Sequence, residues 1–421
     1  MKNSIIILIL FLFILLVGCS KDAIEKFPKD SNVTINIGYI NEEQFKQRYK
    51  ELLESEYPNV RFNVVSTKVL NDPEMMPLQY LQENDVDVLF IPAHRIQEFI
   101  DEGLLTDMGP LIERDQINLK NYVSSVIELI RQYGQGKLYG MPTTFYGQAI
   151  AFNSDIFDEY KIEYPRDQMS WLEILQLANK FSVAESNHKE LKGITLRYSN
   201  LVNLILHIGN TEGLQVYNAK RQQVMINGSA WSSIWMNTIE IDKLGSLDFN
   251  VDLNTYIDPF LSGDRAMAII SYDDFKRLEQ HSPSFKWSTV TMPVSPSEPS
   301  YTHYLNVPGI YAIPNSTDNK EAAWDIIKFL NSDQAARWEY RTDYGFSTLS
   351  NHLVTNEKYE ELVMPFYQLS PVTDSFDELP FEILELLNPY AEDIINERIS
   401  LQEGLDRMQE EAENTLKDVH P

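Results

Sequence analysis

Residues 87–103 read DVLFIPAHRIQEFIDEG, and the hydrophobic pattern of this stretch changes halfway along it. The first part is a continuous apolar run after one aspartate, which is typical of a strand buried in a parallel sheet. Ile96, Phe99 and Ile100 then recur at helical spacing, and Gly103 marks the predicted end of that helix. A buried strand that leads directly into a helix predicts an α/β fold.

The segments before this stretch have a matching organisation. Residues 33–37 alternate between polar and apolar side chains, and residues 59–65 follow as a second predicted strand. Between them, apolar residues recur at helical spacing, with Asn41 or a neighbour as the N-terminal cap. The helical positions are Phe45, Tyr49, Leu52, Leu53 and Tyr57. The order strand, helix, strand, strand, helix favours an α/β sheet protein.

The N-terminus has the features of a secretory signal. An early lysine is followed by an apolar run at residues 5–17, and Gly18 then precedes Cys19, the single cysteine of the chain. The apolar run is shorter than the ~20 residues of a membrane span. The pattern resembles the lipobox of bacterial lipoproteins, which implies that residues 1–18 are a signal peptide and that Cys19 carries a lipid. We therefore predict a tether at residues 19–31 and an extracytoplasmic protein anchored to the cell membrane.

The composition narrows the classes of partner. The chain has 35 basic and 62 acidic residues and a formal net charge of −27, so nucleic acid and anionic lipid head groups are not expected partners. A single cysteine excludes disulfides within the chain. The 421 residues exceed what one hydrophobic core usually covers, so we expect two or more lobes in a monomeric protein.

Motifs of catalysis and metal binding are missing or incomplete. The sequence has no Gly-x-Ser-x-Gly, and residues 134–140 miss the dinucleotide-binding spacing by one position. Residues 248–252 begin like a calcium loop, but Leu253 and Pro259 stand where Gly and Glu are needed. The seven histidines form no metal-binding pair. We therefore predict no catalytic residue, no metal and no cofactor, and adjacent acidic residues leave a secreted glycoside hydrolase as a less favoured alternative.

Six separated segments resemble one family and occur in the expected order. They are residues 102–105, 136–157, 170–175, 260–267, 321–330 and 401–405. Two clear examples are GKLYGMP at residues 136–142 and FLSGDRAM at residues 260–267. These segments are similar to those of extracellular solute-binding family 1, the broad family of the maltose-binding protein.

This resemblance implies a type II periplasmic-binding-protein-like fold of two hinged α/β lobes. The chain is then expected to cross between the lobes near Gly147, Met292-Pro293 and Asn331. The predicted boundaries are residues 32–147 plus 294–330 for lobe 1 and residues 148–293 plus 331–421 for lobe 2. Ligands of open α/β sheets lie at the carboxyl ends of the strands, and closure of the lobes would complete their binding site.

The resemblance also implies ligand-binding residues in lobe 1. Tyr39 and Asn41 follow the first strand, although a role in packing or in capping the next helix is equally open for them. His94 and Arg95 stand where the maltodextrin branch has an Asp-Arg pair that binds sugar hydroxyls. Arg95 has the alternative of capping the strand end or pairing across the lobe. Tyr146 lies at the first crossover, where that branch has a ligand-contacting acid.

Four further ligand-binding residues are implied in lobe 2. Tyr198 and Asn200 lie near the segment that contacts sugar in the maltodextrin branch. Tyr272 and Asp273 follow the strand after residues 260–267, where that branch has a stacking tryptophan.

Two departures from the family pattern affect the expected ligand. Ile91 and approximately Leu384 stand where the maltodextrin branch carries its other stacking tryptophans. Maltodextrin itself is therefore not expected, whereas a different sugar or a non-sugar solute remains compatible.

The function implied by the resemblance is that of a substrate-binding lipoprotein of an ABC importer. It would capture a small solute, by preference a sugar or oligosaccharide, and deliver it to the permease subunits in the membrane. A surface sensor read by a kinase or chemoreceptor has the same fold and stays open as an alternative.

Overall fold

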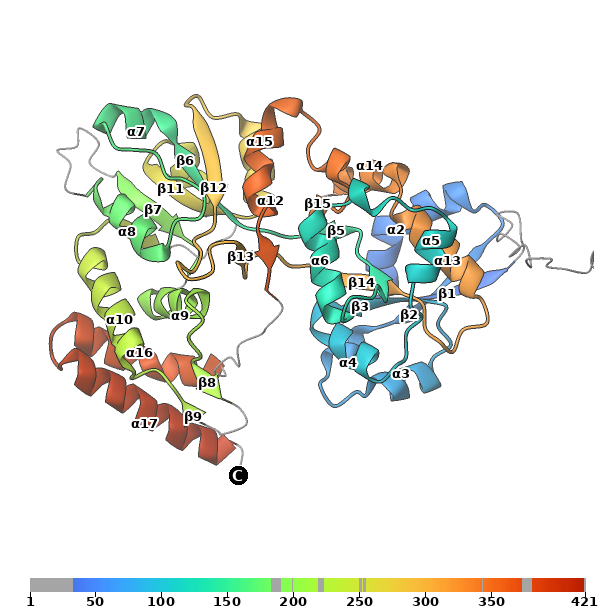
Figure 1. Cartoon of the computed structure of the whole chain (residues 1–421), viewed down its shortest axis with the longest axis horizontal. Helices are drawn as coiled ribbons and strands as arrows, with labels where there is room; N and C mark the ends of the chain where they lie inside the picture. Colours follow the sequence, from blue (N-terminus) through green and yellow to red (C-terminus); the bar gives the residue numbers. More distant parts are fainter. Residues whose placement is uncertain are drawn as a thin grey trace, which may run out of the picture.

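The structure is a computed structural model that describes residues 33–419 except for 183–190, 199, 219–222, 250–251, 253–254, 343 and 373–380. The chain forms two lobes that follow one another along the longest axis of the molecule (Figure 1). Within the described residues, each lobe is built around a five-stranded sheet. The predicted two-lobed α/β fold is confirmed.

The sheet of lobe 1 has the strand order β2-β1-β3-β14-β4. Strands β1, β2 and β3 are parallel, whereas β14 is antiparallel to both β3 and β4. The bounds are β1 Thr34–Tyr39, β2 Arg61–Ser66, β3 Val88–Pro92, β4 Gly140–Met141 and β14 Gly309–Ala312. The strands predicted at residues 33–37, 59–65 and 87–91 are therefore present, with ends shifted by one or two residues.

Helices surround this sheet. Local sequence explains where one of them begins and where another ends. They are α2 Glu42–Glu56, α3 Pro77–Glu83, α4 Ile96–Asp101, α5 Gly109–Arg114, α6 Ser124–Tyr133 and α13 Lys320–Leu330. Helix α2 begins after Asn41, whose side chain accepts a hydrogen bond from the backbone N–H of Gln44 at 2.9 Å. Helix α4 is followed by Gly103, which has a φ of 66° that other residues rarely adopt.

The sheet of lobe 2 has the order β10-β7-β11-β6-β12. Strands β10, β7 and β11 are parallel, and β6 is antiparallel to β11 and β12. The bounds are β6 Ala149–Asn153, β7 Lys192–Leu196, β10 Leu247–Phe249, β11 Arg265–Ile270 and β12 Trp287–Thr291. Every residue of β6 is buried, because helices pack on both faces of this sheet.

The helices of lobe 2 belong to two packing groups. They are α7 Ser154–Tyr160, α8 Trp171–Asn179, α9 Leu201–Thr211, α10 Ser229–Asp242, α11 Asp258–Leu261, α12 Tyr272–His281, α16 Phe381–Ile395 and α17 Leu401–Val419. Buried residues of α8, α9, α10 and α17 share one hydrophobic core. Buried residues of α11 and α12 instead belong to the core that continues into lobe 1.

The chain passes between the lobes at several points. The first passage leads from β5 (Thr144–Phe145) through Tyr146 and Gly147 into β6, and a second connects β12 to β14. After Asn331, however, α14 (Asp333–Thr342) packs on α2, and β15 (Phe346–Ser347) pairs with β5. The predicted lobe boundary at Asn331 is therefore too early, because the segment that follows it is bound to lobe 1.

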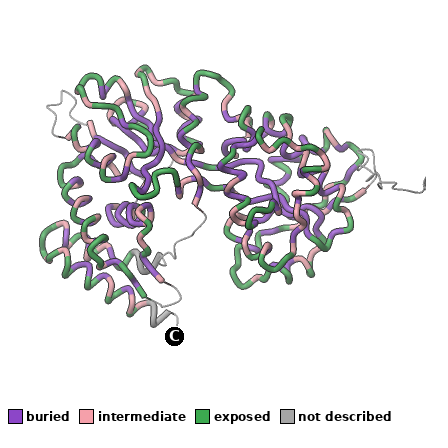
Figure 2. Tube along the Cα trace, in the orientation of Figure 1, coloured by how far each residue is buried: buried purple, intermediate pink, exposed green. Residues whose placement is uncertain are grey.

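Aromatic side chains fill the joint between the lobes. The ring of Phe346 lies 4.8 Å from that of Tyr272 and 5.0 Å from that of Phe366, measured between centroids. The ring of Phe275 on α12 lies 5.8 Å from that of Phe346, and the ring of Phe145 lies 5.5 Å from it. Figure 2 shows buried residues continuing from both lobes into this region. The lobes thus meet through packed rings as well as through the connecting chain.

Candidate functional site

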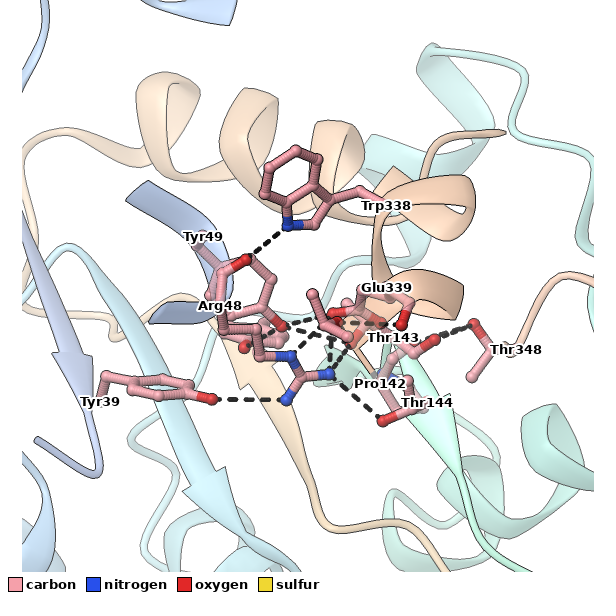
Figure 3. A network of polar contacts seen from close by, with 11 residues as sticks. Tyr39, Arg48, Tyr49, Pro142, Thr143, Thr144, Trp338, Glu339 and Thr348 are labelled. Atoms are coloured by element: carbon pink, nitrogen blue, oxygen red, sulfur yellow. Dashed lines mark hydrogen bonds and ion pairs between the residues drawn. The ribbon is translucent and has the colours of Figure 1, made fainter. Parts of the chain in front are cut away.

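A buried ion pair connects two helices of lobe 1 (Figure 3). Arg48 on α2 donates through Nε to Oε1 of Glu339 on α14 at 3.0 Å, and a second guanidinium nitrogen lies 2.7 Å from the same oxygen. The two side chains are only 5% and 3% exposed. Because an uncompensated buried charge is costly, each of these charges requires the other, and α14 is thereby held on lobe 1.

Tyrosine hydroxyls extend this network. Tyr49 donates to Oε1 of Glu339 at 2.7 Å, and Tyr311 donates to the hydroxyl oxygen of Tyr49 at 2.7 Å. Arg48 donates to the hydroxyl oxygen of Tyr39 at 3.3 Å. Burial raises the pKa of Tyr49 and of Tyr311 well above the usual value, so both hydroxyls stay protonated and act as donors.

The chain that leads to the first crossover joins the same network. Arg48 donates to the hydroxyl of Thr143 at 3.2 Å, and Thr143 donates to Glu339 at 3.1 Å. The indole of Trp338 donates to the backbone carbonyl of Arg48 at 2.7 Å, as Figure 3 shows. The segment just before Tyr146 is therefore fixed against both α2 and α14.

Two tyrosines lie at the edge of this fixed network. Tyr146 is 39% exposed, and its backbone exchanges hydrogen bonds of 2.7 and 2.9 Å with Asn306. The partly exposed ring of Tyr344 has its centroid 4.4 Å from the guanidinium carbon of Arg48, which is a cation–π contact. Gly345 follows with a φ of 105°, and a Cβ there would lie 3.2 Å from the ring of Tyr146. The ring of Tyr146 thus packs beside the residue next to Tyr344.

Lobe 2 has its own ion pair at the carboxyl ends of two parallel strands. Arg197 follows β7 and donates to Oδ2 of Asp274 at 2.7 Å. The Asp274 side chain is 2% exposed, and it also accepts a hydrogen bond from the backbone N–H of Ser271 at 2.9 Å. This bond is part of the capping box that begins α12, so the same carboxylate caps a helix and binds an arginine.

Charges from both lobes act on the hydroxyl of Tyr146. Burial raises the pKa of Tyr146, the charge of Arg48 opposes this shift, and the charge of Asp273 adds to it. Arg48 belongs to lobe 1, whereas Asp273 is an exposed residue of α12 in lobe 2. The crossover tyrosine therefore lies within electrostatic reach of groups on both sides of the joint.

Three of the residues predicted in lobe 1 lie in different environments. Tyr39 is 2% exposed, and its ring packs among aromatic residues of the core. Asn41 is partly exposed and caps α2. His94 is exposed on a short 3₁₀ turn, Ala93–Arg95. Only the hydroxyl of Tyr39 joins the Arg48 network, and ligand contact by these residues stays a prediction.

The contacts of Arg95 are those of a residue that stabilises lobe 1, which was the alternative to ligand binding. Its side chain is 3% exposed and donates to the backbone carbonyls of Leu70, Asp72 and Met75. It also forms an ion pair of 2.7 Å with Glu98 on α4. These bonds fasten the loop before α3 to the end of β3, so the described contacts of Arg95 hold lobe 1 together. Contact with a ligand is an untested prediction for this residue.

The residues predicted in lobe 2 are also mostly structural in their described contacts. Tyr198 is 8% exposed and packs against Trp171, with the ring centroids 6.0 Å apart. Asn200 caps α9 and donates to Asn388 at 3.1 Å. Tyr272 is 1% exposed in the joint. Asp273 is the exposed member of the set, and it is brought into electrostatic range of Tyr146.

Sequence reasoning missed Arg48, Glu339, Tyr344 and Arg197. One signal was available for Arg48, which falls between Phe45 and Leu52 on the apolar face of the predicted helix. A charged residue on such a face is expected to have a buried partner. Nothing in the local pattern named that partner, because Glu339 lies 291 positions away.

Some predictions fall on residues that are not described. Cys19 and the tether at residues 19–31 lie outside the described part of the chain, as does the side chain of Leu384. Within the described residues, no three His, Cys, Asp or Glu side chains gather as a metal-binding group. None of the helices found there has the length and hydropathy of a membrane span.

Comparison with known proteins adds a family and several related folds. The family described as bacterial extracellular solute-binding protein matches residues 38–337. A family 1 solute-binding protein of Alicyclobacillus acidocaldarius has a TM-score of 0.69 at 17% identity, over 91% of this chain and 98% of its own. A sugar transporter protein of Rhizobium etli in an open conformation has a TM-score of 0.61 at 18% identity, over 90% and 98%. An ABC substrate-binding protein of Listeria monocytogenes in complex with cycloalternan has a TM-score of 0.57 at 18% identity, over 92% and 100%.

Proposed function

Because the chain belongs to the bacterial extracellular solute-binding protein family, we propose that it binds a sugar or oligosaccharide between its two lobes and delivers it to an ABC importer. Its partners would be the ligand and the transmembrane permease subunits. A carbohydrate is proposed because proteins of similar fold bind or transport sugars, as the cycloalternan complex and the Rhizobium etli protein illustrate.

The observation that carries this proposal is the position of Tyr146. Its exposed ring lies at the first crossover, beside Gly345 in lobe 1 and within electrostatic range of Asp273 in lobe 2. A sugar offers an apolar C–H face for stacking on a ring and hydroxyls for hydrogen bonds to a carboxylate. A ligand that engages both residues at once would favour the closed arrangement of the lobes.

Tyr344 is proposed as a second stacking residue. Arg48 covers part of its ring at 4.4 Å, and Arg48 is itself fixed by Glu339, so the position of the ring is well determined. A ring that is held in place before binding loses little conformational freedom when a ligand stacks on it. The proposed binding surface of lobe 1 therefore consists of Tyr146 and Tyr344 on a rigid base.

Lipid anchoring at Cys19 is proposed from the lipobox-like sequence. Several acyl chains would hold the protein on the outer side of the cell membrane, where a single chain binds only marginally. Anchoring keeps the receptor near the permease and so raises its local concentration there. Labelled palmitate should enter the wild-type protein but not the Cys19→Ala variant, and label in that variant would contradict the assignment.

Ligand binding can be tested by a thermal-shift screen of mono- and oligosaccharides on the purified protein without its anchor. A sugar at 100 times its Kd should add about 2.7 kcal/mol to the free energy of unfolding. Hits are then measured by calorimetry, and small-angle scattering should show a smaller radius of gyration in saturating ligand. If no sugar binds but polyamines or phosphoesters do, the carbohydrate proposal is wrong.

A further inference from the structure

The arginines at the strand ends and beneath the proposed binding surface have their charges matched by acidic partners. This holds for Arg48 and Arg95 in lobe 1 and for Arg197 in lobe 2, in the part of the chain that the structure describes. We propose that the site selects uncharged sugars and rejects acidic ones such as uronates and sugar phosphates. The inference rests on the proposed function and adds to it the charge class of the ligand.

Arg48 is a cation in contact with the proposed stacking surface. Its guanidinium lies directly against the ring of Tyr344, yet two of its nitrogens bind Oε1 of Glu339 at 3.0 and 2.7 Å. Its other hydrogen bonds go to the hydroxyls of Tyr39, Thr143 and Thr144. With a side chain that is 5% exposed, Arg48 cannot turn toward a ligand without leaving Glu339 as a buried, unmatched anion.

Arg197 is the corresponding cation of lobe 2. It follows β7 at the strand ends and is 18% exposed, so it is the arginine most accessible to a ligand in this set. Its guanidinium is bound by Asp274 at 2.7 Å and lies 4.6 Å from the ring centroid of Tyr256. Asp274 has no freedom to move away, because its carboxylate also caps α12 through Ser271.

The contacts of Arg95 within lobe 1 leave its guanidinium unable to bind an anionic ligand. Three backbone carbonyls accept hydrogen bonds from its two terminal nitrogens, Glu98 forms an ion pair with it, and the side chain is 3% exposed. The position at which the resemblance implied a sugar-binding arginine is therefore filled by a residue directed inward.

One exposed acidic residue of lobe 2 acts electrostatically on Tyr146. Asp273 lies in lobe 2 on the first turn of α12, and its charge adds to the raised pKa of the Tyr146 hydroxyl. A carboxylate or phosphate of a ligand would find no arginine with an unmatched charge among the three described here. A neutral sugar, in contrast, needs no cationic partner and can stack its ring on the exposed side chain of Tyr146.

The test is calorimetry with matched pairs of neutral and acidic sugars. Glucose is compared with glucuronate and glucose 6-phosphate, galactose with galacturonate, and the disaccharides of each in the same way. We expect the neutral member of any pair that binds to bind at least about tenfold more tightly. Equal or tighter binding of the acidic member overturns the inference but leaves the proposed function intact. If no sugar of either kind binds, the proposed function is overturned and the inference falls with it.

Two variants test whether charge matching is the cause. Glu339→Gln and Asp274→Asn keep the size of each side chain but leave Arg48 or Arg197 unmatched. Each should raise the affinity for the acidic member relative to the neutral member by about tenfold at low salt, and added salt should reduce that gain. Melting curves verify folding, and either variant alone suffices if the other does not fold.

A matched control separates this effect from a general change in net charge. Glu397→Gln removes the carboxylate partner of Lys243, a surface pair in lobe 2 with an N–O distance of 2.6 Å between residues that follow α10 and α16. This variant should leave the acidic-to-neutral affinity ratio unchanged. An equal gain in the control, or no gain in both site variants, overturns the assignment of selectivity to the buried pairs.

Discussion

Each lobe contains an arginine–carboxylate pair with a buried carboxylate, but the two pairs are built differently. The pair of Arg48 and Glu339 joins residues 291 positions apart, and tyrosine and threonine hydroxyls surround it. The pair of Arg197 and Asp274 joins neighbouring strand ends through one hydrogen bond of 2.7 Å, and its arginine is 18% exposed. The pair in lobe 1 is thus held by a buried network of hydrogen bonds between distant segments. The pair in lobe 2 has fewer partners and a more exposed arginine.

The difference in burial predicts a difference in stability. Removing a partner from a fully buried pair leaves an uncompensated charge, whereas an arginine near the surface can be solvated by water. Variants of the two pairs should therefore differ in how much stability they lose. Variants of Arg95 and Tyr146 should show which of these two residues supports the fold and which binds the ligand.

The largest effect is expected for Glu339→Ala. This change leaves Arg48 buried without its anion and removes an acceptor of Tyr49 and Thr143, so the free energy of unfolding should fall by about 3–5 kcal/mol. Urea unfolding followed by circular dichroism measures the change. Glu403→Ala breaks the exposed pair with Arg407 on α17 and should cost less than ~1 kcal/mol. Similar losses for both variants would contradict the role given to the buried pair.

The next largest effect is expected for Arg95→Ala. The free energy of unfolding should fall by about 3 kcal/mol, because three backbone carbonyls lose a charged donor. Sugar binding at saturating concentrations should survive, since the described contacts of Arg95 are all within lobe 1. Arg407→Ala on α17 serves as the control for loss of a surface arginine. A variant that melts normally but binds no sugar would instead restore Arg95 to the ligand site.

Tyr146→Ala should affect binding rather than folding. Loss of a ring that packs against ligand typically costs about 1–3 kcal/mol, which is a 5- to 150-fold rise in Kd. The melting temperature should change little, because the ring is 39% exposed. Tyr164→Ala removes a comparably exposed tyrosine that is hydrogen-bonded to Asp158, and its Kd should match the wild type. Wild-type affinity in the Tyr146 variant would move the binding surface elsewhere.

The smallest effect is expected for Asp274→Ala in lobe 2. Arg197 can then be solvated in part, so the loss should reflect one charged hydrogen bond and one helix cap, about 1–2 kcal/mol. Urea unfolding of this variant beside Glu339→Ala makes the comparison direct. A loss as large as that of Glu339→Ala would mean that the two pairs contribute equally to stability. The proposed difference between the lobes would then be wrong.

Much of the fold was accessible from local pattern. The apolar run at residues 87–91 and the helical spacing after it predicted β3 and α4, because strand and helix periods are set by neighbours in the sequence. Asn41 was recognised as a helix cap for the same reason, since its partner Gln44 is three residues away. The five family segments between residues 102 and 330 fall within the matched range of residues 38–337, whereas the sixth, at residues 401–405, lies outside it.

The sequence by itself therefore predicted the first three strands and the two helices among them, and its family resemblance implied the two lobes and the position of Tyr146 at a crossover. Only the tertiary structure decided that α14 stays on lobe 1, that Glu339 neutralises Arg48, and that Arg95 is directed inward. Hydrophobic period and capping act over a few residues, so one sequence can reveal them. The pairing of a buried charge depends on which distant segments pack together, and that choice is made by the folded chain as a whole.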